Sequence, residues 1–170
     1  MADASLGMLL ALLAGALSYA ATYLPDSLGV RWGAGIVFGV LVLAPSQRGT
    51  RNRVALLAVS ALAYRAAVWI AETLHTEAGW PAIGACVLAG AAGVLFVSLG
   101  SSAVLRTRAD LRAIGLASIA GALSGVAIGV CVDATDESLA QQVLLLAGYV
   151  VWQVGYAAAH RLAPAWSAAR

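Results

Sequence analysis

The sequence predicts an all-α, polytopic integral membrane protein, in which residues 1–170 form a single six-helix transmembrane bundle with both termini in the cytoplasm. Its composition, its apolar segments and the charges between them carry this prediction. Hydrophobic residues make up 62% of the chain and charged residues 11%, and the mean hydropathy is +0.89. Soluble domains are about half apolar and a quarter charged, so this surplus of apolar surface indicates that lipid is the solvent.

Six apolar segments are candidates for membrane-spanning helices, because a helix needs about 20 mostly apolar residues to cross a bilayer. They cover residues 5–24, 30–45, 54–74, 80–104, 113–132 and 139–159, and the second is the shortest. A hydrophobic segment in lipid must satisfy its own backbone hydrogen bonds, which a helix does within the segment. The first segment lacks a positively charged start and is long, so we expect it to be a retained span and not a signal peptide.

The connections between these segments alternate in charge. One set, with the C-terminal tail, carries the arginines Arg48, Arg51, Arg53, Arg106, Arg108, Arg112, Arg161 and Arg170. The other set carries the acidic residues Asp26, Glu72, Glu77, Asp133, Asp136 and Glu137. Because arginine-rich connections stay in the cytoplasm, this pattern predicts cytoplasmic termini. The compact chain and its Ala-, Gly- and Arg-rich composition favour the inner membrane of a bacterium.

Arg65 departs from this alternation, because it lies inside the third segment in the stretch ALAYRAAVW. The twelve residues from Arg53 to Arg65 span about 18 Å as a helix, near the middle of a hydrocarbon core about 30 Å thick. An arginine at that depth costs roughly 2.5–3.5 kcal/mol on insertion scales, so something should offset the cost. Three interpretations stay open: hydrogen bonds to neighbouring helices, a site for a solute or ion, and incomplete burial at a subunit interface.

Glu72 is the nearest acid to Arg65, two helical turns further along the same face. A shared water is plausible at that separation, whereas we do not expect a direct contact. The pair places a carboxylate at the boundary of the same candidate site.

A second polar feature lies in the sixth segment, where Tyr149, Trp152, Gln153 and Tyr156 follow the spacing of a single helix face. Tyrosine and tryptophan usually lie at the membrane interfaces, so this face at mid-depth indicates a polar cavity wall. Hydrogen bonding between helices is the equally weighted alternative. Arg65 and Gln153 fall at similar depths, so a shared site is possible.

The fifth segment carries a ridge of small residues at Ala117, Gly121, Gly125 and Gly129, four residues apart. Such a ridge lets another helix approach closely. Packing within the chain is the preferred interpretation, and an interface in a homo-oligomer or with a partner subunit is the alternative.

The sequence therefore predicts a small membrane protein that transports or binds a solute or ion, with Arg65, Glu72 and the sixth-segment face as its site. A small anionic solute would suit Arg65. The alternative is a non-catalytic subunit of a larger membrane complex, assembled through the glycine ridge. No motif for a catalytic residue, metal site or cofactor is present, so an enzyme is the less favoured interpretation. The arginines are explained by topology, so no nucleic-acid partner is expected.

Overall fold

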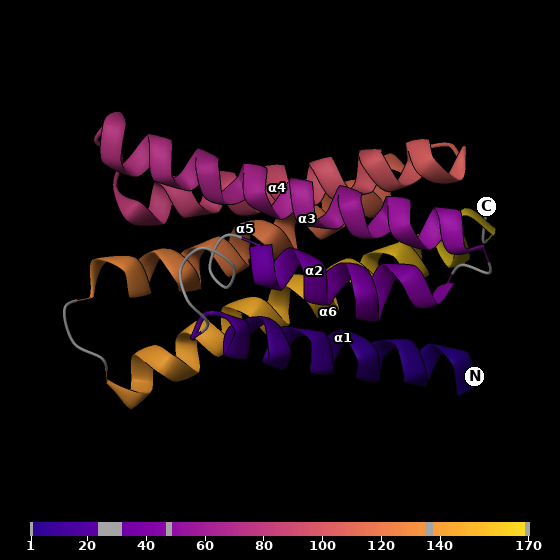
Figure 1. Cartoon of the computed structure of the whole chain (residues 1–170), viewed down its shortest axis with the longest axis horizontal. Helices are drawn as coiled ribbons and strands as arrows, with labels where there is room; N and C mark the ends of the chain where they lie inside the picture. The colour runs from indigo at the N-terminus through magenta and orange to yellow at the C-terminus, as the bar shows by residue number, and fades with distance from the viewer. Residues whose placement is uncertain (1, 24–31, 47–48, 135–137, 169–170) are drawn as a thin grey trace.

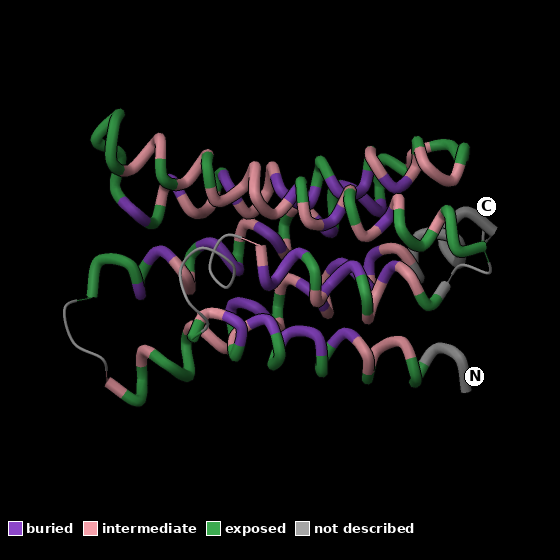
Figure 2. The backbone as a smooth tube through the Cα atoms, in the orientation of Figure 1, coloured by how far each residue is buried: buried purple, intermediate pink, exposed green. Residues whose placement is uncertain are grey.

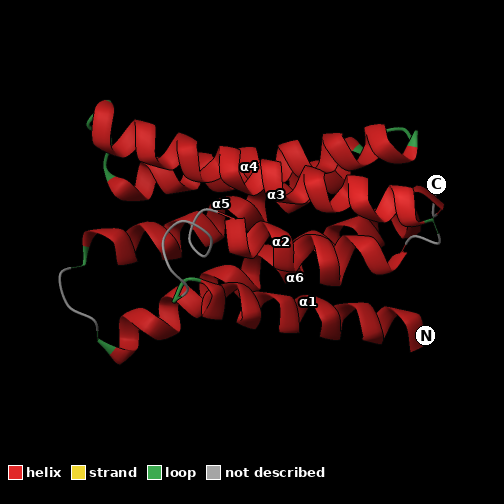
Figure 3. Cartoon of the chain, in the orientation of Figure 1, coloured by secondary structure: helices red, strands yellow, loops and turns green. Residues whose placement is uncertain are grey.

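The computed structural model of the chain is all-helical in its described part, which comprises residues 2–23, 32–46, 49–134 and 138–168 (Figure 1). Within these ranges, the side chains of residues 2–4, 46 and 161–168 are left out of the description. Figure 3 shows helices joined by short loops. The helices are α1 (Ala2–Ala21), α2 (Ala34–Phe38), α3 (Thr50–Glu72), α4 (Ala82–Leu105), α5 (Leu111–Asp133) and α6 (Leu139–Ala168).

Within the described residues, four helical segments are long and apolar enough to cross a membrane, and they indicate a membrane-embedded protein. They are Thr50–Glu77, Ala82–Leu105, Leu111–Asp133 and Leu139–His160, of 28, 24, 23 and 22 residues. The first two expected spans are represented by shorter apolar helices, Ser5–Ala21 and Ala34–Leu43. Residues 24 and 30–31, at the ends of those two expected spans, lie outside the described residues.

Helix α2 is irregular at its C-terminal end. It continues as a π-helical turn over Gly39–Leu43 and a 3₁₀ turn over Ala44–Ser46. Pro45 lies in this 3₁₀ turn and has no amide hydrogen to donate to the preceding turn of the helix. Helix α3 also ends in a π-helical segment, Thr73–Glu77. Such widened turns are frequent at functional sites.

The chain runs up and down the bundle, so α1 begins and α6 ends at the same end of the molecule (Figure 1). That end also holds the start of α3 and the connection from α4 to α5, which carry Arg51, Arg53, Arg106, Arg108 and Arg112. The opposite end holds Glu72, Glu77 and Asp133. The charged residues Asp26, Arg31, Arg48, Asp136, Glu137 and Arg170 lie outside the described residues, as does the side chain of Arg161. We call these the basic end and the acidic end.

The interior of the bundle is formed by Phe38, Leu56, Val94 and Val97, each at most 1% exposed. Figure 2 shows buried backbone on the inward sides of the helices and exposed backbone on their outer sides. Large apolar side chains remain on those outer sides. Examples are Leu9, Leu62, Ile119 and Val143, all more than half exposed, as expected of surfaces that contact lipid.

Close backbone approach holds the helices together in three pairs. A Cβ atom added at Gly15 of α1 would lie 2.7 Å from the Cα of Val150 in α6, and one at Gly35 of α2 would lie 2.8 Å from the carbonyl oxygen of Ser60 in α3. In the third pair, one at Gly129 of α5 would lie 2.5 Å from the Cα of Ile83 in α4. A larger residue would have to separate each pair.

Candidate functional sites in two cavities

Arg65 forms an ion pair with Glu72, with 3.5 Å between Nη1 and Oε2. We expected no direct contact between these two side chains. That prediction is wrong, because the two extended side chains bridge the two helical turns between them. The Arg65 side chain is 27% exposed and that of Glu72 is 46% exposed. The Nη1 atom is buried and makes no hydrogen bond in the described structure, so Glu72 provides its charge compensation.

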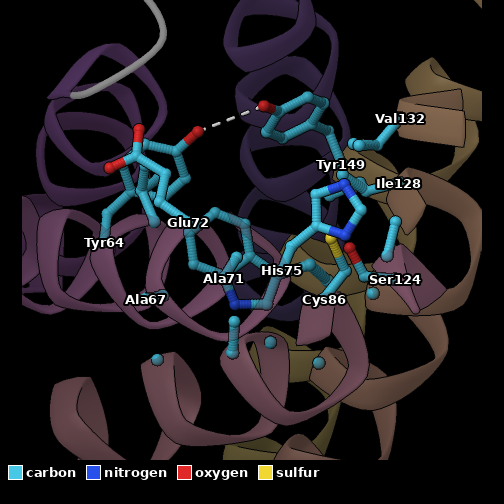
Figure 4. Close-up of a pocket in the computed structure, with 18 of the residues that line it drawn as sticks. Tyr64, Ala67, Ala71, Glu72, His75, Cys86, Ser124, Ile128, Val132 and Tyr149 are labelled. Atoms are coloured by element: carbon cyan, nitrogen blue, oxygen red, sulfur yellow. Dashed lines mark hydrogen bonds between the residues drawn. The ribbon is translucent and has the colours of Figure 1, made fainter. Parts of the chain in front are cut away.

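A cavity of about 370 Å³ lies among α3, α4, α5 and α6, and we call it the tyrosine cavity. Tyr64 of α3 and Tyr149 of α6 point toward each other across it, with 3.1 Å between their hydroxyl oxygens (Figure 4). Its other polar lining residues are Glu72, His75, Thr76 and Ser124. Arg65 does not line the cavity, so its guanidinium lies behind Glu72 and not on the cavity surface.

Small residues create the space of the tyrosine cavity. Its walls include Ala67, Ala71, Ala89, Gly90, Gly93, Gly121 and Gly125. Along α3 the lining extends from Thr76 at the acidic end to Tyr64, twelve residues or about 18 Å. The cavity therefore reaches from the acidic end to about mid-membrane depth. Small-molecule sites usually measure about 300–1,000 Å³, so its volume suits a small solute.

The polar face expected on α6 is divided among different neighbours. Trp152 lines the tyrosine cavity beside Tyr149. Gln153 is fully buried against α1, where its Nε2 donates to the Ser18 hydroxyl at 2.5 Å. Tyr156 lies deeper toward the basic end and contacts Phe38. The residues expected to share one site therefore lie in three places: the wall of the tyrosine cavity, a hydrogen bond between helices, and a second cavity.

The second cavity measures about 540 Å³ and lies nearer the basic end. Its apolar side comes from α1, the α2 region and the start of α3, including Leu6, Leu10, Leu41 and Leu56. Its polar side comes from α4, the following turn and α6. The polar lining residues are Ser98, Ser101, Ser102, Thr107, Tyr156 and His160. We call it the serine cavity.

His160 is the functional candidate that the sequence analysis missed. Its Nε2 lies 3.4 Å from Ser98 Oγ, although 62 residues separate the two, and its ring contacts Tyr156 at 4.3 Å between centroids. The available signal was its spacing, because residue 160 follows Tyr156 by one turn on the same face. A nucleophile and its base usually lie about 2.6–3.2 Å apart, so we interpret the pair as hydrogen-bonding groups of a cavity wall.

A stack of aromatic rings connects residues that line the two cavities. The Trp152 ring contacts both Tyr64 and Phe38, with centroids 5.9 Å and 5.3 Å away and an interplanar angle of 24° in each pair. Phe38 then meets Tyr156 edge-on at 5.0 Å. We call Phe38, Trp152 and Tyr156 the aromatic barrier. Phe38 is 0% exposed, so the barrier is packed shut at its centre.

The glycine ridge of α5 lies against α4. Added Cβ atoms at Gly121 and Gly125 would collide with the carbonyl oxygens of Gly90 and Cys86, and Gly129 packs against Ile83. In this structure the ridge therefore serves packing within the chain, and α4 covers the face that a partner helix would need.

No group of three or more metal-binding side chains occurs among the described residues. No protein-family model, curated protein or solved structure matches the chain.

Proposed function

We propose that this chain is a small multi-pass transport protein of the bacterial inner membrane, which binds a small solute in the tyrosine cavity and passes it to or from the serine cavity. All six helices cross or enter the bilayer in this proposal, and the basic end with both termini faces the cytoplasm. Tyr64, Tyr149 and Trp152 contact the solute. Arg65 acts indirectly by pairing with Glu72.

The proposal is supported by the closeness of residues that line the two cavities along the same helices, next to the aromatic barrier. On α6, Trp152 lines the tyrosine cavity and Tyr156 the serine cavity, four residues or about 6 Å apart. On α4, the corresponding residues are Gly93 and Ser98, about 8 Å apart. Small rearrangements of a few aromatic side chains would join cavities that together extend through most of the bundle.

The alternative function is a non-catalytic subunit of a larger membrane complex. It would need a docking face other than the ridge of Gly121, Gly125 and Gly129, because α4 already covers that ridge. The transport proposal accounts for the cavities and the barrier, whereas the subunit interpretation leaves both without a role.

Site-specific labelling tests which end each cavity opens to. Cys86 is half-buried and lines the tyrosine cavity, so a Cys131→Ser background offers a native reporter thiol. A second background, with both cysteines changed to serine, carries Ser102→Cys in the serine cavity. The proteins are placed in liposomes in one orientation and treated with a membrane-impermeant maleimide from either side.

We expect Cys86 to be labelled from the side of the acidic end and the Ser102→Cys thiol from the other side. Leu62→Cys serves as the lipid-facing control, since Leu62 is 61% exposed on the outer surface, and it should resist the reagent from both sides. Labelling of both cavity thiols from the same side, or of neither, would refute the proposed path.

A further inference from the structure

We infer that the solute is an uncharged, planar and mostly apolar molecule with one or two hydrogen-bonding groups, and that the protein discriminates against ions. This inference rests on the proposed function of the two cavities as one path. It replaces the anionic solute expected from Arg65, because that guanidinium pairs with Glu72 and does not line either cavity.

The charges around the path are compensated. Among the described residues that line the tyrosine cavity, Glu72 is the one with a fixed charge, and Arg65 lies 3.5 Å from it. No Asp, Glu, Lys or Arg is among the described residues that line the serine cavity. Moving an ion from water into an apolar site costs several kcal/mol unless a counter-charge receives it. Among the described lining residues, neither cavity offers a charge that is free to receive an ion.

Neutral hydrogen-bonding groups, in contrast, are present in both cavities. In the tyrosine cavity the hydroxyls of Tyr64 and Tyr149 bond to each other; both can still accept a hydrogen bond from a solute, and the one that accepts in their mutual bond can also donate. In the serine cavity Ser101 is 8% exposed, and its buried Oγ makes no hydrogen bond in the described structure. A buried hydroxyl without a partner costs about 1–3 kcal/mol, so a solute alcohol, carbonyl or amide would relieve that cost.

Ring faces and cavity size set the shape of the solute. The path is bordered by Tyr64, Trp152 and Tyr156, and Trp152 already stacks with Tyr64 and Phe38, so a planar solute that replaces one of these rings keeps a stacking contact. The smaller cavity, at about 370 Å³, limits the size of what can pass. A single substituted ring fits both constraints.

Three probes that share one ring and differ in charge test the inference: benzyl alcohol, benzoate and protonated benzylamine. Binding is measured by saturation-transfer NMR on the protein in nanodiscs at neutral pH. The Ala71→Trp variant fills the tyrosine cavity, and Leu62→Trp adds the same ring to the lipid-facing side of the same helix. N-ethylmaleimide on Cys86, in the Cys131→Ser background, blocks the folded cavity without relying on the fold of a variant.

We expect wild type and Leu62→Trp to bind benzyl alcohol saturably and at least tenfold more tightly than either ion. Binding should disappear in Ala71→Trp and after alkylation of Cys86. Glu77→Gln, at an exposed position of the acidic end outside the cavity lining, should change the affinity for benzyl alcohol less than twofold, because a neutral solute gains nothing from a nearby carboxylate.

Three results would overturn the inference. Preference for benzoate would show that Arg65 exchanges Glu72 for the solute, and preference for benzylamine would show that Glu72 binds a cation. Absence of saturable binding by all three probes would also refute this class of solute. If the thiols of the two cavities are then still labelled from opposite sides, the proposed path stands and only the proposed class of solute is wrong. If they are not, the proposed function fails as well.

Discussion

Tyr64 and Tyr149 join α3 to α6 at mid-depth, with their hydroxyl oxygens 3.1 Å apart although 85 residues separate them in the sequence. The bond closes the deep end of the tyrosine cavity near the ring of Trp152. It is therefore both an interhelical contact and part of the proposed solute site.

Removing this hydrogen bond should lower stability moderately. Tyr64→Phe and Tyr149→Phe should each cost about 0.5–1.5 kcal/mol, since interhelical hydrogen bonds in membranes are of this order. The double variant should cost about as much as either single one, because both lose the same bond. Unfolding in mixed micelles measures the three values. Additive losses would show that each hydroxyl has a different partner.

The contact between α4 and α5 predicts a contrast between two glycines of α5. Gly125→Ala places a Cβ against the Cys86 carbonyl oxygen, so the helices must separate, at a cost of about 1–3 kcal/mol. Gly115→Ala has nothing within 4 Å of the new Cβ and should be neutral, or stabilising by about 0.4–1 kcal/mol. Thermal unfolding in detergent compares the two. Equal losses would contradict the close contact.

The hydrogen bond from Gln153 to Ser18 should be costly to break from one side. Ser18→Ala leaves a fully buried amide donor unpaired, which costs about 1–3 kcal/mol. Gln153→Leu in the same chain removes the donor, so the double variant should recover part of that loss. Gln142→Leu, at an exposed position of α6, is the control. Denaturant unfolding of the four variants decides whether the recovery occurs.

The aromatic barrier predicts a leak when Trp152, its ring on the side of the tyrosine cavity, is removed. Trp152→Ala deletes the ring that stacks on both Tyr64 and Phe38, so the two cavities should connect and pass small uncharged molecules in both directions. Trp69→Ala removes the same side chain from an outer surface that is 58% exposed, and should leave the barrier intact. Swelling of proteoliposomes in a small uncharged polyol, to which the lipid bilayer is poorly permeable, measures the leak. Equal swelling with the two variants would place the barrier elsewhere.

The helices and their ends were predictable, because apolar length, proline and charge are local properties of the sequence. Asp110, in an arginine-rich connection, accepts bonds at 3.0 and 3.2 Å from the amides of Arg112 and Ala113 and so begins α5. The expected second span is represented by the shorter apolar helix Ala34–Leu43, and residues 30–31 of that span lie outside the described residues, so its crossing stays a prediction. Apolar length predicted this helix but not that it ends in turns of other geometry.

The candidate site was harder to predict, since periodicity shows which residues share a face and not which neighbour covers each of them. Trp152 and Gln153 are adjacent, yet about 100° of rotation directs one to a cavity and the other to α1. Arg65 attracted attention through its charge, whereas the cavity beside it arises from alanines and glycines that carry no individual signal. His160 gained its partner Ser98 from a helix 62 residues away, which required the packing to be known.

The pairing of α1 with α6 has a consequence for how the chain is made. Helices α2 with α3 and α4 with α5 are hairpins, so each can close as soon as its second member leaves the ribosome. The first helix also contacts α2, but its contact with α6 can form only after the last helix has been synthesised. Until then α6 does not cover the surface of α1 at Gly15, and the Ser18 hydroxyl lacks its hydrogen-bond partner Gln153. The chain is therefore an incomplete helical bundle in the membrane until its last helix packs against its first.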